Sequence, residues 1–366
     1  TFGGPQRQYT RSMNPRFDIH SGGSAPSHLV WSPLNRPDLA VFNEISDAVR
    51  VEEWSRPDLL TSVRRGPTLV MTCDYGGAHK GSRYETLAFL IADLAFVWLW
   101  DDFRTRIRRQ HLGDGRRLSY KGLSDRWRAQ AVVPFLRASN TIPGLLVVFA
   151  VSKTCLHLLS EPLPARDASE VPLGAWKTAP FERLSRIGLL GATLLSCMSG
   201  PHQNVLWVTD QDEIAPNVPK LTEASAVVAH YIAHICRHPL GHIRFGTTAS
   251  DDGTLQLEDL AALADLGAGA VSDVLSRFKD SFGRAAGPVL CSLPRDLPRK
   301  AQMLTGWLAE QWHPLRKLII VVDDVGDSMH RTSVVRMGID RPIPEFDWRT
   351  EVSEYLANKI VFRAAL

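Results

Sequence analysis

Single aspartates follow two apolar, strand-like segments of this 366-residue chain. Asp74 comes directly after the run Leu69–Cys73. Asp210 comes directly after Val205–Thr209, and Asp212 lies two residues further on. Strand ends in an open α/β sheet face the crevice where ligands bind, and Mg²⁺ and Mn²⁺ prefer oxygen ligands, so the pattern indicates a divalent-cation site. A structural interpretation stays open, because Asp after a strand also caps helices and begins turns.

A third acid lies inside a segment rich in small residues. Residues 255–270 have the length and composition of a helix with an unusually small face, and Asp265 lies within it. Glu258 is two turns earlier on nearly the same face, whereas Asp259 lies about 120° away from Asp265. Small residues let a helix approach a sheet closely, so Asp265 is expected to point into the same crevice. Alternatively, it faces solvent on the outer side of a packed helix.

Several short segments together resemble a known family. They are Asp-Tyr-Gly-Gly at 74–77, Ser-Tyr-Lys at 119–121 before a helix, Lys153 after a buried strand, Thr-Asp-Gln-Asp-Glu-Ile-Ala-Pro-Asn at 209–217, and the acidic and small residues of 258–269. In this order they look like the bacterial "domain of unknown function 3800" group, which is similar to the ribonuclease H-like superfamily. The resemblance covers roughly residues 66–280.

The resemblance implies a fold and a reaction. The fold is a mixed sheet with helices on both faces and an acidic cluster over its centre. Asp74 would lie on the first strand, Asp210 on the fourth and Asp265 on the following helix. In ribonuclease H-like enzymes such acids bind two Mg²⁺ ions about 3.5–4 Å apart, one of which activates water. The implied function is a nuclease or another nucleic-acid-processing protein that depends on Mg²⁺ or Mn²⁺.

The predicted site has a fixed centre and several supporting candidates. We expect Asp74, Asp210 and Asp265 to be catalytic metal ligands, supported by Asp212, Glu258 or Asp259, with Lys153 or Lys121 stabilising charge on phosphate. The superfamily's usual Glu on the first core helix has no clear match here, although Glu85, Asp212 or Glu258 could substitute. An incomplete metal site is the alternative. The chain would then be a catalytically inert component of a bacterial complex that binds nucleic acid or protein.

Basic residues are concentrated in one stretch. Residues 104–128 contain nine Lys and Arg but only two acids. Such a run can contact phosphates, and interleaved aromatic rings can stack on bases. The alternative is an ordinary solvated surface. The predicted nucleic-acid interface consists of Arg104, Arg106, Arg108, Arg109, Arg116, Arg117, Tyr120 and Lys121.

Two other kinds of site compete with this interpretation. His230, His234, His238 and His242 recur every four residues around Cys236, a spacing that can chelate zinc on a helix, although Pro239 should end that helix. Separately, Asp210-Gln211-Asp212, Thr247 and Val325-Gly326-Asp327-Ser328 resemble the haloacid dehalogenase-like phosphatases. That pattern has extra residues before Gly-Asp and makes no use of Asp74 or Asp265.

The elements that must position these residues alternate along the chain. Strands are predicted at 68–73, 84–91, 145–151, 205–208, 242–247 and 318–322, and helices at 39–51, 123–138, 181–197, 221–236, 255–275 and 299–311. This alternation predicts an α/β fold. With the resemblance, we expect a ribonuclease H-like core at 66–280, a partly irregular N-terminal arm at 1–65 and a C-terminal α/β extension at 281–366.

Composition excludes several other classes of protein. The net charge is +3 and 44% of residues are hydrophobic, as in ordinary globular proteins. The apolar run Leu87–Trp100 is too short to span a bilayer and contains Asp93, so no membrane partner is expected. Five scattered cysteines without a Cys-x-x-Cys pair favour a reducing cytoplasm. The expected partner is nucleic acid. The protein is also expected to form a homo-oligomer or a complex with other proteins.

Overall fold

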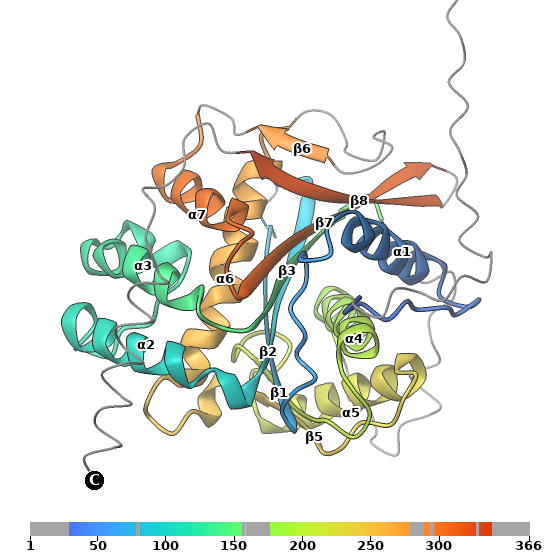
Figure 1. Cartoon of the computed structure of the whole chain (residues 1–366), viewed down its shortest axis with the longest axis horizontal. Helices are drawn as coiled ribbons and strands as arrows, with labels where there is room; N and C mark the ends of the chain where they lie inside the picture. The colour runs from blue at the N-terminus through green and yellow to red at the C-terminus, as the bar shows by residue number, and fades with distance from the viewer. Residues whose placement is uncertain are drawn as a thin grey trace, which may run out of the picture.

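One mixed β-sheet runs through the residues that the computed structural model describes, which are 29–77, 79, 81–155, 158, 176–278, 289–292, 296–326 and 329–338. Within these residues eight strands are paired in the order β5-β4-β1-β2-β3-β7-β8-β6 (Figure 1). Their bounds are β1 Thr68–Gly76, β2 Tyr84–Asp93, β3 Gly144–Ser152, β4 Asn204–Thr209, β5 Ile243–Thr247, β6 Val289–Ser292, β7 Leu315–Gly326 and β8 Met329–Gly338.

The strand directions bring five strand ends to one edge of the sheet. β1 is parallel to β4, and β4 is parallel to β5. β2 is antiparallel to both β1 and β3, and β3 is parallel to β7. Strands β1, β3, β4, β5 and β7 therefore point the same way. We refer to the edge formed by their C-terminal ends as the carboxyl edge.

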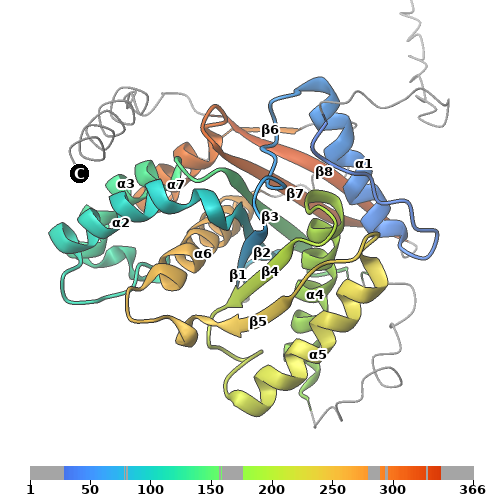
Figure 2. The ribbon, with the colours of Figure 1, turned by 60° about the horizontal axis from the view of Figure 1, so that its bottom comes forward.

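Helices cover both faces of this sheet. Figure 2 shows α1, α4 and α5 on one side of the strands and α2, α3, α6 and α7 on the other. Their bounds are α1 Ala40–Ser55, α2 Trp98–His111, α3 Arg126–Ser139, α4 Thr178–Met198, α5 Val218–Ile235, α6 Gln256–Leu275 and α7 Arg299–Ala309. Each face has its own hydrophobic core, and together they confirm the predicted α/β fold. None of the described helices is both long and apolar enough to cross a membrane.

Alternation along β1 determines which face each side chain meets. Met71 and Cys73 belong to the core beneath α4, whereas Val70 belongs to the core beneath α6. Thr72 is on the α6 face as well, because its hydroxyl donates a hydrogen bond to the carbonyl of Leu260, at 3.1 Å. Side chains alternate along a strand, so Asp74 is also directed to the α6 face.

Helix α6 approaches the sheet closely. Besides the Thr72 contact, the hydroxyl of Thr86 on β2 donates to the carbonyl of Ala268, at 3.1 Å. Strand hydroxyls can reach helix carbonyls only where small side chains separate the two elements. The close approach expected from the composition of residues 255–270 is therefore present. It also fixes the direction of α6, which runs from the middle of β1 toward the carboxyl edge.

Both ends of the described chain belong to the same sheet and core as the middle. Trp31, Phe42 and Ile45 are buried on the α4 face, and the Glu53 carboxylate accepts a hydrogen bond from the Val30 N–H at 2.7 Å. At the other end, β7 pairs with β3, and β8 and β6 continue the sheet. Residues 1–28 and 339–366, parts of the expected arm and extension, lie outside the described residues.

A buried lysine links β7 to the neighbouring helices. The Lys317 ammonium donates to Asn140 Oδ1 at 2.6 Å and to the Glu310 carbonyl at 3.2 Å. The Trp307 indole N–H donates to the same Asn140 oxygen, at 3.0 Å. Burial lowers the pKa of Lys317 to about 7, although the Glu310 carboxylate opposes this shift. Lys317 therefore loses its proton near neutral pH in the folded chain.

Lys317 is expected to make stability depend on pH. An unfolded lysine keeps its proton to about pH 10.4, so above pH 7 the unfolded state binds more protons than the folded state. The free energy of unfolding should rise with pH in that range, by up to about 1.4 kcal/mol per unit. Urea unfolding at pH 7 and 9 measures this rise, which Lys317→Met should lack. The exposed-site variant Lys177→Met should retain it, and parallel pH profiles for wild type and Lys317→Met would contradict the prediction.

Candidate active site at the carboxyl edge

Asp74 and Asp210 lie side by side at the carboxyl edge. Cys73 of β1 is paired with Thr209 of β4, so the next residue on each strand is one of the two aspartates. Neighbouring strands are about 4.7–4.9 Å apart, which makes the two backbones immediate neighbours. The Asp74 carboxylate accepts a hydrogen bond from the Tyr75 N–H at 2.6 Å, and Asp210 accepts one from the Gln211 N–H at 2.8 Å.

Asp265 reaches the same edge from α6. One of its oxygens accepts a hydrogen bond from the Tyr120 N–H, at 2.5 Å. The Tyr120 hydroxyl donates to Asp273, about two turns further along α6, also at 2.5 Å. Between these contacts lies Gly269, where a Cβ would stand 2.2 Å from the Tyr120 ring. Glycine at this position thus lets Tyr120 lie flat on α6 and direct its N–H at Asp265.

The aspartates influence each other's ionisation. Burial raises the pKa of Asp74 well above its usual range, and the nearby carboxylates of Asp265 and Asp210 raise it further. Burial also raises the pKa of Asp265, while the Tyr120 N–H and the ammonium groups of Lys121 and Lys300 oppose that shift. No ion pair to Asp74 or Asp265 is formed within the described residues. Negative charge at this edge is therefore only partly compensated.

Glu258 and Asp210 share a third set of contacts. Thr248 follows β5, and its hydroxyl donates a hydrogen bond to Asp210 Oδ1 at 3.1 Å. The Arg117 guanidinium lies 2.8 Å from Glu258 Oε1 and 3.8 Å from Asp210 Oδ1. Burial raises the pKa of Glu258, and the Arg117 charge opposes the increase. The acidic cluster of this site thus consists of Asp74, Asp210, Glu258 and Asp265.

The donor set of this cluster fits a hard divalent cation. All four side chains offer carboxylate oxygens, the ligands that Mg²⁺ and Mn²⁺ prefer. Glu258 is buried, and its Oε1 has no aligned hydrogen-bond donor in the described residues, since Arg117 meets it as an ion pair only. As the side chains stand, however, no three His, Cys, Asp or Glu of the described residues form a group that could hold a metal. Metal binding would thus require carboxylate side chains to turn.

Asp259 lies apart from the acidic cluster. Its two oxygens accept hydrogen bonds from Arg108 at 2.5 and 2.6 Å, and one of them also accepts from Arg104 at 3.1 Å. All three side chains are buried between α2 and α6. We expected Asp259 to support a metal and both arginines to contact nucleic acid. Instead, the three residues form a buried ion-pair cluster that joins two helices, and neither arginine faces solvent.

The other predicted interface residues differ in exposure. Tyr120 is buried against α6, with the Lys300 ammonium 4.0 Å from its ring centroid, so its face is not free to stack on a base as expected. Arg116 is half-buried and pairs with Asp114 and with Asp125. Arg106, Arg109, Arg117 and Lys121 are exposed. Of these four, only Arg117 and Lys121 have interactions with the acidic cluster.

Three further candidates are directed elsewhere. Asp212 lies near Tyr75 on the α4 face and accepts a hydrogen bond from the Ile214 N–H at 3.0 Å, and burial raises its pKa. Glu85 is held by Arg183, at 2.7 Å, and by Arg186 on the same face, so its carboxylate is directed away from the acidic cluster. Lys153 follows β3 at the carboxyl edge, but its ammonium donates to the His79 carbonyl at 2.8 Å. Two strand spacings, about 10 Å, separate β3 from β1.

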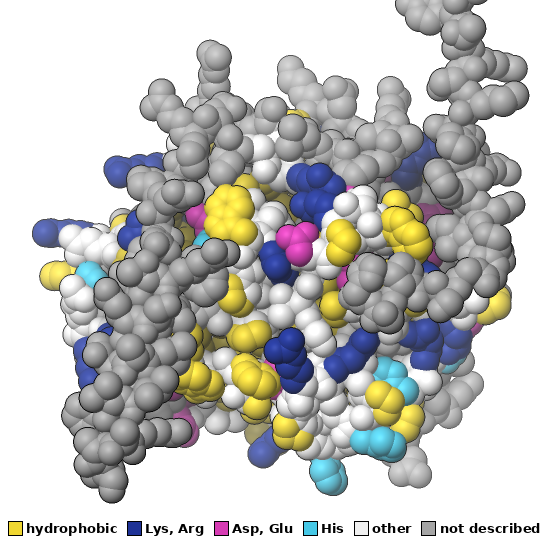
Figure 3. Space-filling model, viewed as in Figure 1, with side chains coloured by type: hydrophobic (Ala, Val, Ile, Leu, Met, Phe, Trp, Pro, Cys, Tyr) yellow, Lys and Arg dark blue, Asp and Glu magenta, His cyan; other side chains and the backbone are white. Residues whose placement is uncertain are grey.

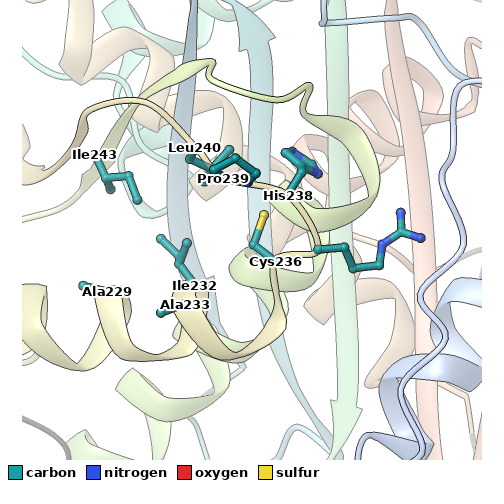
Figure 4. Close-up of a pocket in the computed structure, with 9 residues that line it drawn as sticks. Ala229, Ile232, Ala233, Cys236, His238, Pro239, Leu240 and Ile243 are labelled. Atoms are coloured by element: carbon teal, nitrogen blue, oxygen red, sulfur yellow. The ribbon is translucent and has the colours of Figure 1, made fainter.

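The histidines expected as an alternative zinc site are engaged separately. His234 contacts Asp38 at 3.0 Å, and His238 contacts Ser199 at 2.9 Å. Histidine side chains gather at the lower right of Figure 3, over the region of α5. Beside them is a pocket of about 370 Å³, in which α5 residues face the loop His238–Leu240 (Figure 4). It adjoins Ile243 at the start of β5, so it lies at the opposite edge of the sheet from the acidic cluster.

The pattern expected for a phosphatase is spread across the sheet. Val325 and Gly326 end β7, while Asp210 follows β4, and β1, β2 and β3 lie between these two strands. Four strand spacings amount to about 19 Å, too far for two groups to act on one phosphate. Asp327 and Ser328 lie outside the described residues.

Sequence reasoning missed two members of this site. Thr248 could have been found, because it follows a predicted strand whose end belongs to the same edge as Asp210. Lys300 on α7 carries no such signal, since its approach to Tyr120 and Asp265 depends on how α7 packs. In comparisons with known proteins, no family model, no curated protein and no solved structure matches this chain.

Proposed function

We propose that this protein is a divalent-cation-dependent phosphodiesterase that acts on nucleic acid, with a ribonuclease H-like core. The observation that carries the proposal is the acidic cluster, which three separate elements contribute to one edge of the sheet. Asp74 lies on β1, Asp210 follows β4 and Asp265 lies on α6. The "domain of unknown function 3800" resemblance, which is part of this proposal, implies the same three positions.

A divalent cation would be held by Asp74, Asp210 and Asp265, with Glu258 beside Asp210. Mg²⁺ or Mn²⁺ suits these oxygen ligands, and a bound cation would supply an activated water and neutralise charge on phosphate. The chain itself provides the positioning. The Tyr120 N–H orients Asp265, and the Thr248 hydroxyl orients Asp210.

Basic side chains beside the acidic cluster suit a phosphate group. Arg117 and Lys121 are exposed, and Lys300 lies close enough to oppose the pKa shift of Asp265. Fixed cations near a reacting phosphate stabilise the charge that develops in the transition state. This mixture of carboxylates and cations favours a phosphodiester over an uncharged substrate, and hydrolysis would add water across one P–O ester bond.

One observation favours a second candidate, a binding protein without catalysis. In the described residues the carboxylates do not converge into a ready metal group, and Arg117 already pairs with two of them. A component that binds nucleic acid or protein would need only the basic side chains. It would bind oligonucleotides equally well in a chelator and in Mn²⁺.

Cleavage of labelled oligonucleotides separates the two candidates. Single-stranded DNA and RNA, duplexes and hybrids are incubated with the purified chain in Mg²⁺, Mn²⁺ or EDTA. The phosphodiesterase predicts products that require the cation and that are lost in Asp74→Asn protein purified in parallel. Binding without cation-dependent products would support the second candidate, and equal cleavage by wild type and variant would indicate a contaminant and refute the first.

A further inference from the structure

Arg117 bridges two members of the acidic cluster from the solvent side. Its guanidinium nitrogens lie 2.8 Å from Glu258 Oε1 and 3.8 Å from Asp210 Oδ1. The Arg117 side chain is 57% exposed, whereas that of Glu258 is only 7% exposed. An exposed guanidinium is thus the main positive charge facing a buried carboxylate.

The Arg117 contact is electrostatic and replaceable. Although Glu258 Oε1 is buried, it receives no aligned hydrogen bond within the described residues. Arginine usually binds carboxylates through parallel, aligned N–H groups, and that geometry is not used here. The oxygen therefore keeps the capacity to bind a different cation, and Asp210 beside it is already oriented by Thr248.

The backbone at Arg117 is held while its side chain is free to turn. The Arg128 guanidinium donates to the Arg117 carbonyl at 2.6 Å. Three residues later, the Tyr120 N–H is fixed on Asp265 at 2.5 Å. The guanidinium can therefore leave Glu258 by side-chain rotation alone, without unfolding of the 112–121 loop, and it would remain close to anything bound at the acidic cluster.

We propose that Arg117 and a divalent cation exchange at Glu258 and Asp210, and that the displaced guanidinium then binds a phosphate of the nucleic-acid substrate. The inference rests on the proposed function, because it assigns the order in which that site is filled. Arg117 is thus a substrate-binding residue that pairs with the two carboxylates until the cation binds. Metal binding and substrate binding are thereby coupled, and each strengthens the other by the same factor.

Substituting Arg117 should increase the affinity for Mn²⁺ and weaken the coupling between Mn²⁺ binding and oligonucleotide binding. Without the competing guanidinium, Mn²⁺ should bind to Arg117→Ala protein about 5- to 10-fold more tightly than to wild type, within the range typical of coupled sites. Arg117→Lys keeps a cation and should be intermediate. In wild type, Mn²⁺ should strengthen the binding of a cleavage-resistant phosphorothioate oligonucleotide by at least about 5-fold. Arg117→Ala should lose that enhancement.

Calorimetric titration with Mn²⁺ and fluorescence anisotropy of the labelled oligonucleotide test the inference. Arg244→Ala, at an exposed arginine on β5, serves as the matched control and should behave as wild type. Equal Mn²⁺ affinity in wild type and Arg117→Ala would overturn the exchange while leaving the proposed function intact. No Mn²⁺ binding to either protein would refute the metal site and the exchange together.

Discussion

Asp74→Asn protein is expected to cleave phosphodiesters at least about 10²-fold more slowly than wild type, without becoming less stable. The rate loss follows from removing one of the charges that would hold the cation, since loss of a single preorganised electrostatic group commonly costs 10²–10³ in rate. Stability should be preserved because burial and Asp265 already raise the pKa of Asp74. Asparagine keeps the shape of the side chain and removes that repulsion.

Two measurements on one preparation separate chemistry from folding. Single-turnover cleavage in Mn²⁺ gives the rate, and urea unfolding in EDTA gives the free energy of unfolding. Asp252→Asn is the matched control, because Asp252 is an exposed aspartate in the turn before α6 and should leave both values unchanged. If Asp74→Asn cleaves as fast as wild type, Asp74 takes no part in the reaction.

Asp259→Asn is expected to destabilise the protein by about 3–5 kcal/mol, the usual cost of removing one partner from a buried ion pair. Asp259 accepts hydrogen bonds from Arg104 and Arg108, and all three side chains are buried between α2 and α6. Asparagine would leave the buried Arg108 guanidinium without a counter-charge and Arg104 with only the part-exposed carboxylate of Asp101. The position of α2 over the sheet should be lost first, because this ion-pair cluster joins it to α6.

Urea unfolding of Asp259→Asn checks this value. Asp114→Asn removes an aspartate from an exposed pair with Arg116, and its unfolding midpoint should match that of wild type. A triple variant, Arg104→Met, Arg108→Leu and Asp259→Leu, should recover much of the loss, because apolar groups of similar volume need no counter-charge. A change below about 1 kcal/mol for Asp259→Asn would show that the two arginines are solvated in the folded protein.

The strands and helices with strong apolar patterns were predictable from the sequence, and α2 was not. The stripe that α2 buries is Trp100, Arg104 and Arg108, spaced four residues apart. Two of these three residues are arginines, which a search for hydrophobic periodicity counts as polar. The segment was therefore interpreted as part of a basic surface. Only the partner, Asp259 on another helix, makes arginine a buried residue there. No local pattern contains that information.

The last strands were missed for a different reason. β8 pairs antiparallel with β7, and β6 is a four-residue strand that pairs with the far end of β8. Neither has the apolar run that predicted the strand at 318–322. Their conformation depends on pairing with a strand already in the sheet, which is a tertiary property. β-propensity is a weak guide to strands whose conformation depends on such pairing.

The acidic cluster was predicted better than its surroundings. Asp74 and Asp210 could be placed because both follow strands, and parallel strand ends share an edge. Tyr120 was expected to stack on a base, yet its ring packs on Gly269 and its backbone orients Asp265. Arg117 was expected to contact nucleic acid, and its pairing with Glu258 and Asp210 was not foreseen. Side-chain contacts of this kind are made between a loop and a helix 140 residues apart in sequence, beyond the reach of spacing arguments.

The pairing of β3 with β7 has a consequence for how the chain folds during its synthesis. Val147 and Leu318 are partners, although 171 residues separate them. While the chain is being synthesised, β3 is an open edge of almost entirely apolar sequence until β7 has been made and can pair with it. Unprotected apolar edges recruit other strands. The protein therefore depends on its own C-terminal region to avoid aggregation, and shortening it before residue 315 would expose β3 permanently.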